Sequence, residues 1–342
     1  MQARLLGAPQ PAADEHRDPT TEPANDAPVL SRKADLSQIV HKVWWLPGDS
    51  QFELTWRYYL LARVLQPRSF LKTVAFGPSW FVRIDPNAAI PRFEVTKTLQ
   101  FGQGVEIGPI ATQADANKLV QLLEDAFDLC RYYHILEQAP NGQACAYFEM
   151  GRCPAPCDGT VPMSQYRETV ARTVRFMLGE RDTFYMEAES AMQAAAKGLQ
   201  FEQANLMKMR LDRARGIEHA SFRLLRRVGA FNYLIVQRGQ SRAWVKPFFF
   251  TRGRLEVGEA VRLRKVDEAI PAWIDRMAAE AGREVDTPSD QRSHLCWLVA
   301  HYLFKPDPPG VFMHESTVQD AVEVGRCIRG QFTSKPVPKK TE

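Results

Sequence analysis

Four cysteines lie close together in the middle of a sequence that holds six in all. They are Cys130, Cys145, Cys153 and Cys157, and two prolines stand between the last two. Thiolates are soft ligands, and four of them can hold a zinc ion or an iron–sulfur cluster. Because proline restricts the backbone, the last pair predicts a tight turn with both sulfurs on one side. The spacing alone leaves zinc and iron–sulfur open.

A disulfide framework or ordinary buried thiols are the alternatives to a metal site. Residues 1–26 are polar and proline-rich and lack the apolar segment of a secretory signal. This favours a cytoplasmic location, where disulfides are rare, so a shared metal or cluster is the preferred interpretation. Cys296 and Cys327 stand alone in apolar surroundings and are predicted to be core residues.

Basic side chains are unevenly distributed along a chain whose net charge is only +4. Seven lysines and arginines fall between residues 208 and 227, against two acidic residues. A local basic stripe fits the phosphate backbone of DNA or an acidic protein surface, and a solvated helix face is the structural alternative. The candidate DNA-binding residues are Arg210, Arg213, Arg223, Arg226 and Arg227.

At 342 residues and 45% hydrophobic content, the chain can build two or three modest cores. No apolar run approaches the length of a membrane-spanning helix, so no membrane partner is expected. Residues 1–36 are rich in proline, alanine and acidic side chains without periodicity, which predicts a disordered tail.

The elements before the cysteines are short. Ser50 and Glu53 fit a capping box that begins a helix over residues 52–65, and this helix has an apolar row at Leu54, Tyr58, Leu61 and Leu65. Further patterns predict strands at 38–45, 79–84 and 91–97 and a helix at 112–127.

After the cysteines the pattern turns helical and then mixed. Helices are predicted at 165–178 and over a long run from 182 to 228 that is interrupted near Gly216, which indicates a helical hairpin. The C-terminal part predicts strands at 231–237, 243–250 and 254–257 and helices at 266–281, 290–302 and 318–329. The fold class is therefore α+β.

The predicted domain organisation has six parts. They are a disordered tail at 1–36, a small segment at 37–75, a cysteine-cluster domain at 76–163, the helical hairpin at 164–228, a C-terminal α+β unit at 229–335 and a tail at 336–342.

The order of these motifs resembles the UvrC family, the nuclease component of the bacterial UvrABC excinuclease. The resemblance covers roughly residues 38–220 and is most specific in the cysteine segment. The residues that carry it are Ile90-Pro91-Arg92, Glu106-Ile-Gly108-Pro109, Phe127-Asp-Leu-Cys130, Cys145-Ala-Tyr147 and Gly151-Arg152-Cys153-Pro-Ala-Pro156-Cys157.

In that family four cysteines hold an iron–sulfur cluster, so the resemblance implies a 4Fe-4S cluster on Cys130, Cys145, Cys153 and Cys157. The interval between the first two is slightly longer than usual. Zinc stays the alternative. The implied setting is nucleotide excision repair, with DNA as a partner.

The hairpin resembles the UVR motif, through which UvrC proteins meet UvrB. Asn205 and Lys208-Met209 depart from the usual alanine and Arg-Asp, and a hairpin that packs on its own domain is the alternative. The implied partner is a UvrB-like protein, and the implied partner-binding residues are Met192, Leu199, Phe201, Glu202 and Ala204.

Both nuclease domains of that family lack their motifs here. Residues 1–50 contain no Gly-Ile-Tyr or Tyr-Ile-Gly strand, so residues 37–75 resemble only the end of a GIY-YIG-like nuclease domain. Glu53 is the single candidate for its metal-binding glutamate, and a lone carboxylate gives no hydrolytic site. Glu53 is therefore expected to cap a helix.

Two hypotheses follow. The first is a non-catalytic, repair-associated protein with a cluster, a partner hairpin and a DNA-binding surface. The second is an active metal-dependent DNA endonuclease with catalytic residues in the C-terminal unit, where His294, His301 and His314 could form a metal site. A separate chain that supplies the nuclease is a third possibility.

Overall fold

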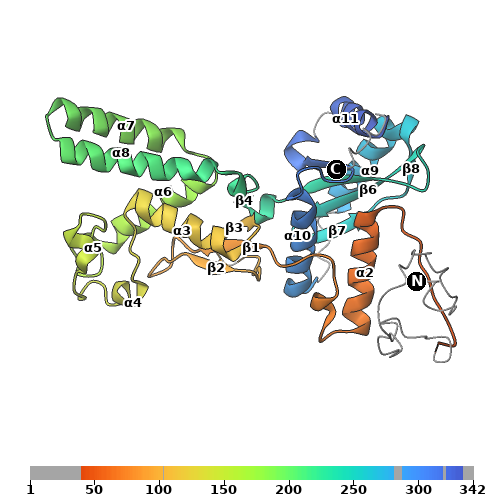
Figure 1. Ribbon diagram of the computed structural model, residues 1–342, viewed down its shortest axis with the longest axis horizontal. Coiled ribbons are helices and arrows are strands. Elements are labelled where there is room, and N and C mark those ends of the chain that lie inside the picture. Colours follow the sequence, from red (N-terminus) through yellow and green to blue (C-terminus); the bar gives the residue numbers. More distant parts are fainter. Residues whose placement is uncertain (1–39, 103, 281–286, 319–320, 334–342) are drawn as a thin grey trace, which may run out of the picture. The chain divides into compact units, whose positions relative to one another are not determined.

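The computed structural model describes residues 40–102, 104–280, 287–318 and 321–333 (Figure 1). The chain divides into two compact units, Met1–Pro47 and Gly48–Glu342. Both predicted tails lie outside the described residues. In the first unit, residues 40–45 form no strand, so the strand predicted there is wrong over these residues.

The middle part of the second unit holds a small sheet, a helical hairpin and several further helices (Figure 1). Its strands are β1 (Trp80–Ile84), β2 (Glu94–Thr96), β3 (Val105–Ile110) and β4 (Arg226–Arg227), and its helices are α3 (Gln113–Phe127), α4 (Tyr133–Leu136), α5 (Ala146–Glu149), α6 (Met163–Met177), α7 (Asp182–Lys197) and α8 (Phe201–Arg215).

The remaining elements build a second sheet with helices around it. The strands are β5 (Tyr233–Arg238), β6 (Trp244–Thr251), β7 (Arg254–Val257), β8 (Val261–Arg262) and β9 (Val311–His314), and the helices are α2 (Gln51–Leu65), α9 (Val266–Glu280), α10 (Ser289–Leu303) and α11 (Ala321–Thr333). Short 3₁₀ turns lie at Phe70–Lys72, Gly216–Glu218, Ala220–Phe222, Val228–Ala230, Leu263–Lys265 and Glu315–Thr317.

The first sheet is antiparallel, with the strand order β2-β1-β3-β4. Gly108 of β3 lies so close to β1 that a Cβ there would stand 2.6 Å from the Phe81 ring, which explains why only glycine fits in this Gly-Pro step. The buried face of α3 packs on the sheet through Ala116, Leu119 and Leu123. This packing fixes the position from which the chain enters the cysteine segment.

The second sheet is also antiparallel, with the order β7-β6-β5-β9 and β8 paired to β6. Its side chains alternate between two cores, as the period of a strand requires. Ile235 faces the core that holds α2 and α10, whereas Leu234 and Val236 face the core of α9 and α11. Helices on both faces of an antiparallel sheet confirm the α+β class.

Helix α2 lies where the sequence predicted it. The face that it buries, however, is opposite to the predicted apolar face. Ser50 caps it, because the Ser50 hydroxyl accepts a hydrogen bond from the Glu53 amide (3.1 Å). The buried side chains are Phe52, Glu53, Thr55, Tyr59 and Ala62, while the predicted apolar row of Leu54, Tyr58, Leu61 and Leu65 is 43–75% exposed. Aromatic contacts to β6 and α10 decided the face.

Glu53 is 1% exposed and lies among positive charges. Its carboxylate accepts from Lys246 Nζ of β6 (2.6 Å) and from the Asp49 amide (3.2 Å), and pairs with Arg57 (2.6 Å). Burial raises the pKa of Glu53, but the Lys246 hydrogen bond and the backbone amide outweigh it, so the pKa lies below its ordinary value. The capping role predicted for Glu53 is confirmed, and its charge joins α2 to the second sheet.

The packing does not follow every predicted boundary. Helix α2 shares a core with Val228, Phe248 and Leu298, so the part of the 37–75 segment that forms this helix packs with the C-terminal unit. The helical run predicted up to residue 228 ends at Arg215, because the chain there forms 3₁₀ turns and the strand β4. Strands β3, β4, β8 and β9 had no counterpart in the prediction.

Candidate metal centre and partner hairpin

Cys130 is held in place directly after α3. Helix α3 ends at Asp128 in the left-handed conformation (φ 51°), and two residues later the Cys130 amide donates to the buried Tyr166 hydroxyl (3.1 Å). The Cys130 thiol points toward the Tyr132 carbonyl (3.6 Å). The backbone of this first cysteine is therefore anchored to α6.

Cys153 and Cys157 stand on either side of Ala155, which is fully buried with a positive φ of 53°, and Cys157 lies in a turn over residues 156–159. The Cys157 thiol lies 3.7 Å from the Gln143 carbonyl, and the Cys157 carbonyl accepts from the Gly142 amide (2.8 Å). Both cysteines are buried. The turn predicted between the two cysteines is therefore displaced: it begins at the second proline and includes Cys157.

Three of the four thiols influence one another. Cys130 and Cys153 share a thiol–thiol hydrogen bond, which raises the pKa of Cys130 and lowers that of Cys153 to about 7. Cys157 contributes to the electrostatic environment of Cys130, and burial raises the pKa of Cys157. One thiolate is thus favoured at Cys153, where the guanidinium of Arg131 adds to the effect.

Cys145 stands apart from these three. It is the N-cap residue of the short helix α5, is half-buried, and makes no thiol hydrogen bond within the described part of the chain. Across the described residues, no three His, Cys, Asp or Glu side chains are arranged as a metal site. The donor types suit zinc or an iron–sulfur cluster, and the direct interaction among them joins Cys130 and Cys153.

Arg131 was missed by the sequence prediction, although it directly follows Cys130. Its guanidinium lies 4.5 Å from the centre of the Tyr147 ring, donates to the Arg152 carbonyl (3.3 Å) and pairs with Asp125. It thus connects the segments that carry Cys130 and Cys153. Its adjacency to a cysteine was the only sequence signal, since Tyr147 and Arg152 lie 16 and 21 residues further on.

Helices α7 and α8 form the predicted hairpin (Figure 1), and its tip is apolar. Leu199 lies between the helices with a positive φ of 57° and is 73% exposed, and Phe201 is 66% exposed. Glu202 is exposed beside them, whereas Met192 and Ala204 are half-buried. The five predicted partner-binding residues thus divide into three at the surface and two that are partly covered.

The base of the hairpin is joined to α3 by charges. Arg210 pairs with Asp128, and Arg213 pairs with Asp125 (3.6 Å). These two arginines were predicted to bind DNA, and their guanidinium groups are only partly exposed. They are therefore engaged in fixing α8 against the helix that leads to the cysteines.

The other three predicted DNA-binding arginines lie near the two sheets. Arg223 donates to the Leu303 and Phe304 carbonyls (3.0 Å each), and the Arg226 guanidinium stands 5.6 Å over the Tyr233 ring. Arg227 is exposed on β4. DNA binding by all five stays a prediction. Arg227 is exposed and makes no ion pair within the described residues.

The histidines of the C-terminal unit do not converge. His294 Nδ1 lies 3.2 Å from the Tyr59 hydroxyl in an aromatic core, and His314 Nε2 lies 2.8 Å from the Ala230 carbonyl. His301 lines a separate hollow beside Pro78. Cys296 is fully buried as predicted, but Cys327 is exposed on α11, so its predicted burial is wrong.

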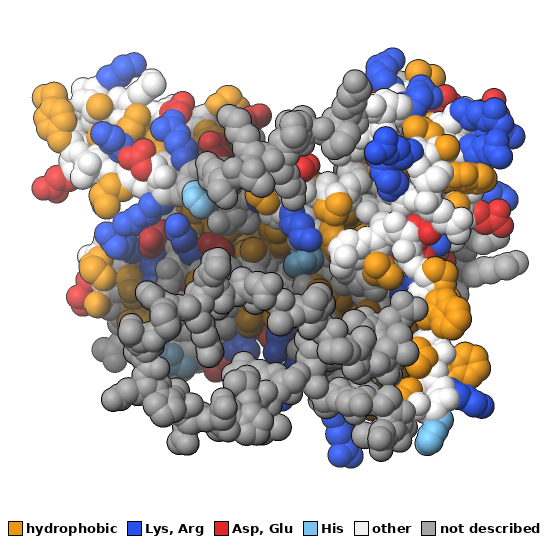
Figure 2. Space-filling model, turned by 45° about the vertical axis from the view of Figure 1, so that its right-hand side comes forward, with side chains coloured by type: hydrophobic (Ala, Val, Ile, Leu, Met, Phe, Trp, Pro, Cys, Tyr) orange, Lys and Arg blue, Asp and Glu red, His pale blue; other side chains and the backbone are white. Residues whose placement is uncertain are grey.

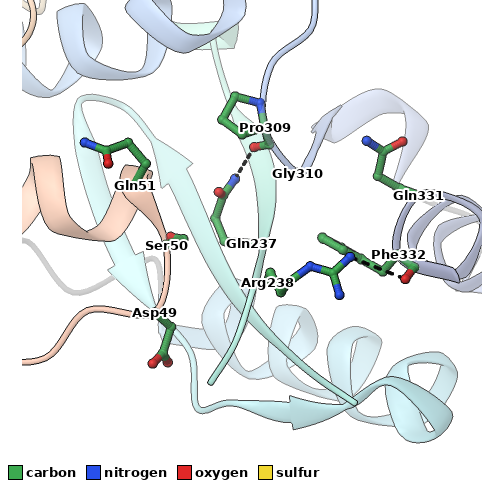
Figure 3. A pocket seen from close by; sticks show the side chains of 9 residues that line it. All are labelled: Asp49, Ser50, Gln51, Gln237, Arg238, Pro309, Gly310, Gln331 and Phe332. Atoms are coloured by element: carbon green, nitrogen blue, oxygen red, sulfur yellow. Dashed lines mark hydrogen bonds between the residues drawn. The ribbon is translucent and has the colours of Figure 1, made fainter. Parts of the chain in front are cut away.

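A polar pocket of about 300 Å³ opens between the start of α2, the end of β5 and α11 (Figure 3). Gln237 donates to the Pro309 carbonyl (2.8 Å) and Arg238 to the Phe332 carbonyl (3.4 Å), so both side chains hold the pocket wall. Asp49 is the one carboxylate among the described lining residues. The pocket therefore offers no acid–base pair for catalysis.

Comparison with known proteins finds a family match in the middle part of the chain. Residues 79–176 match the family model of the UvrC/Cho excinuclease middle domain. UvrABC system protein C of Moorella thermoacetica is 28% identical over 133 residues, which is 38% of this chain and 21% of the relative. The protein of the same name from Clostridium acetobutylicum is 23% identical over 177 residues, 51% of this chain and 28% of the relative.

The chain thus spans between a fifth and three tenths of the length of these curated relatives. No solved structure matches it. The sheet β1–β3, helices α3 and α6, and the cysteine segment between these helices define a UvrC/Cho-type middle domain. Over these residues the chain is related to the UvrC family. No helix of the described residues is long and apolar enough to span a membrane.

Glu124 is a buried titratable group one turn before the end of α3. It accepts a hydrogen bond from the Tyr133 hydroxyl (3.4 Å). Burial raises the pKa of Glu124 from 4.5 to about 7, against the opposing attraction of Arg131. Between these two values, the folded chain therefore holds a proton there that the unfolded chain releases.

We predict that stability falls as pH rises from about 4.5 to about 7, because the raised pKa favours folding only while Glu124 is protonated. The loss is at most about 3.5 kcal/mol, since each unit of pKa shift corresponds to about 1.4 kcal/mol. Glu124→Gln should flatten this slope in urea unfolding at pH 5 and pH 8. The exposed control Glu168→Gln should keep it, and equal slopes in wild type and Glu124→Gln would contradict the assignment.

Proposed function

We propose that this chain is a non-catalytic UvrC-related DNA-repair protein whose middle domain is a scaffold built around a four-cysteine cluster. Its partners are DNA and a UvrB-like protein. The observation that supports the scaffold best is the interaction of the Cys130 and Cys153 thiols, with a smaller electrostatic effect of Cys157, in the part of the chain that matches the middle domain. Cross-linking three distant segments through one metal group would stabilise a domain whose cysteine region has little regular structure.

The proposed ligands are Cys130, Cys145, Cys153 and Cys157, and the group is an iron–sulfur cluster, with zinc as the alternative. Such a group supplies a cross-link, and in the iron form a redox-active centre. The chain's own contribution is the environment of Cys153, where the Cys130 thiol, the Ala155 amide and the Arg131 guanidinium lower the pKa and favour thiolate over thiol. Cys145, at the start of α5, would be the fourth ligand.

Replacing Cys153 and Cys157 together by serine should remove the metal and lower the melting temperature by roughly 5 °C or more. A loss of 1 kcal/mol shifts the melting temperature by about 2–4 °C in domains of moderate size. The measurement is anaerobic purification, absorption spectroscopy, and iron and zinc analysis, followed by thermal unfolding.

Cys327→Ser is the matched control, because that thiol is exposed and stands outside the cluster. Its metal content and melting temperature should equal those of the wild type. A colourless wild-type protein with stoichiometric zinc would replace the iron–sulfur assignment by zinc. A double variant with unchanged metal content and melting would refute the shared site.

The hairpin tip is the proposed contact with a UvrB-like protein. Leu199 and Phe201 are large apolar side chains that the hairpin leaves in water, and Glu202 supplies a charge beside them. Exposed apolar side chains with a polar rim are typical of protein interfaces. Met192 and Ala204 would act by keeping the two helices together.

Phe201→Ser should weaken binding to a purified UvrB-like protein at least tenfold, because loss of a buried aromatic anchor costs more than about 1.4 kcal/mol. Its thermal unfolding should equal that of the wild type, since the side chain is exposed. Leu61→Ser, an exposed apolar site on α2, should leave the affinity unchanged. Equal affinities of wild type and Phe201→Ser would exclude the tip as the contact.

A metal-dependent nuclease in the C-terminal unit is the competing function. Against it, the carboxylate of Glu53 is engaged with Lys246 and Arg57, and His294 and His314 bond elsewhere. We expect no nicking of supercoiled plasmid by the purified chain with Mg²⁺ or Mn²⁺, while DNA binding persists. A nick that depends on divalent metal and is absent from a His294→Ala preparation would favour the nuclease.

A further inference from the structure

Several basic side chains meet a tryptophan at the end of the second sheet, where β5 turns into β6. Strand β8 pairs with β6 so that Arg262 lies directly opposite Trp244. The Leu263 amide donates to the Ala243 carbonyl (2.8 Å), which places the residues after β8 beside the β5–β6 turn. We call the following set the hairpin-end patch: Arg242, Trp244, Arg262, Arg264 and Lys265.

The four basic side chains of this patch are exposed. Across the residues that the structure describes, none of the four makes an ion pair. The carboxylate of Asp267, at the start of α9, is engaged by Arg329. Glu259 and Glu268, each three residues from the patch along the sequence, are the nearest exposed acids without an ion-pair partner among the described residues. Positive charge therefore collects there with little to balance it, which favours a polyanion.

This arrangement differs from that of the basic residues elsewhere in the fold. Lys246, two residues after Trp244, is neutralised by Glu53, and Arg210 and Arg213 of the hairpin base are paired with aspartates. Figure 2 shows Lys and Arg side chains gathered over the C-terminal unit at the upper right. Exposed positive charge thus lies in the C-terminal unit as well as at residues 208–227, and the sequence shows a basic excess in both places.

Trp244 adds a second kind of contact. It is half-exposed, and the Arg262 guanidinium lies 5.3 Å from its ring centre. A guanidinium over an aromatic ring forms a flat surface, and an unpaired base can stack on the face of that surface. Bases in a duplex are already stacked on their neighbours, so only a single strand can use such a surface fully.

We propose that the hairpin-end patch binds single-stranded DNA. Arg242, Arg264 and Lys265 contact backbone phosphates, and the Trp244–Arg262 pair stacks on a base. The proposal rests on the proposed DNA-repair function and adds a contact in a unit that lies beyond the matched middle domain. An acidic protein surface is the competing partner.

The test is fluorescence anisotropy of a labelled 20-nucleotide dT strand and of a 20-base-pair duplex with the full chain at several salt concentrations. The triple variant Arg242→Gln/Arg264→Gln/Lys265→Gln should bind the single strand at least tenfold more weakly. Its salt slope should fall by about 2, because each lost phosphate contact removes about 0.7. Trp244→Leu should weaken single-strand binding several-fold and leave duplex binding nearly unchanged.

The matched control is Arg172→Gln/Arg175→Gln/Lys197→Gln, which removes the same charge from α6 and α7. It should keep wild-type affinity, and an equal loss in the control would show a net-charge effect and overturn the patch. Polyglutamate that competes as well as unlabelled DNA would also overturn it, in favour of an acidic protein. The two proposals fail separately: a wild-type chain without DNA affinity refutes DNA as a partner, whereas a triple variant with wild-type affinity refutes only the patch.

Discussion

The buried contact between Glu53 and Lys246 connects the first helix of the second unit to its larger sheet. A carboxylate that is 1% exposed needs compensation, and here a lysine, an arginine and a backbone amide supply it. The same contact orients α2 so that Phe52 and Tyr59 enter the core. It also engages the one carboxylate that could bind a catalytic metal for a nuclease in this segment. The packing of α2 and any such metal binding therefore depend on the same group.

Charges serve two distinct purposes in the molecule. In the middle domain, arginines are structural: Arg210 and Arg213 fix the hairpin base to α3, and Arg131 bridges the cysteine segments. In the C-terminal unit, the hairpin-end patch leaves its positive charges in water. A basic stretch in a sequence therefore does not locate a binding surface until its acidic partners are known.

Local signals predicted the elements well. The cap at Ser50 and the helix that follows Thr112 rest on interactions within a few residues, and both are present. The helical hairpin is present as well. The sequence could not predict features that depend on contacts between residues far apart in the chain. The buried face of α2 depends on Phe248 and Tyr302, the strand β9 on pairing with β5, and Cys130 on the Tyr166 hydroxyl. The resemblance located the candidate ligands, but the position of Cys145 relative to the other thiols depends on how a loop packs.

The row of apolar side chains along α2 has a consequence for the behaviour of the protein in solution. Leu54, Tyr58, Leu61 and Leu65 follow one another at intervals of four, three and four residues, which is the seam spacing of a coiled coil. Because all four side chains are substantially exposed, α2 presents an apolar surface to water. This apolar row should promote self-association at high protein concentration. Because apolar contacts drive it, the self-association should respond more to temperature and chaotropic salts than to changes in net charge.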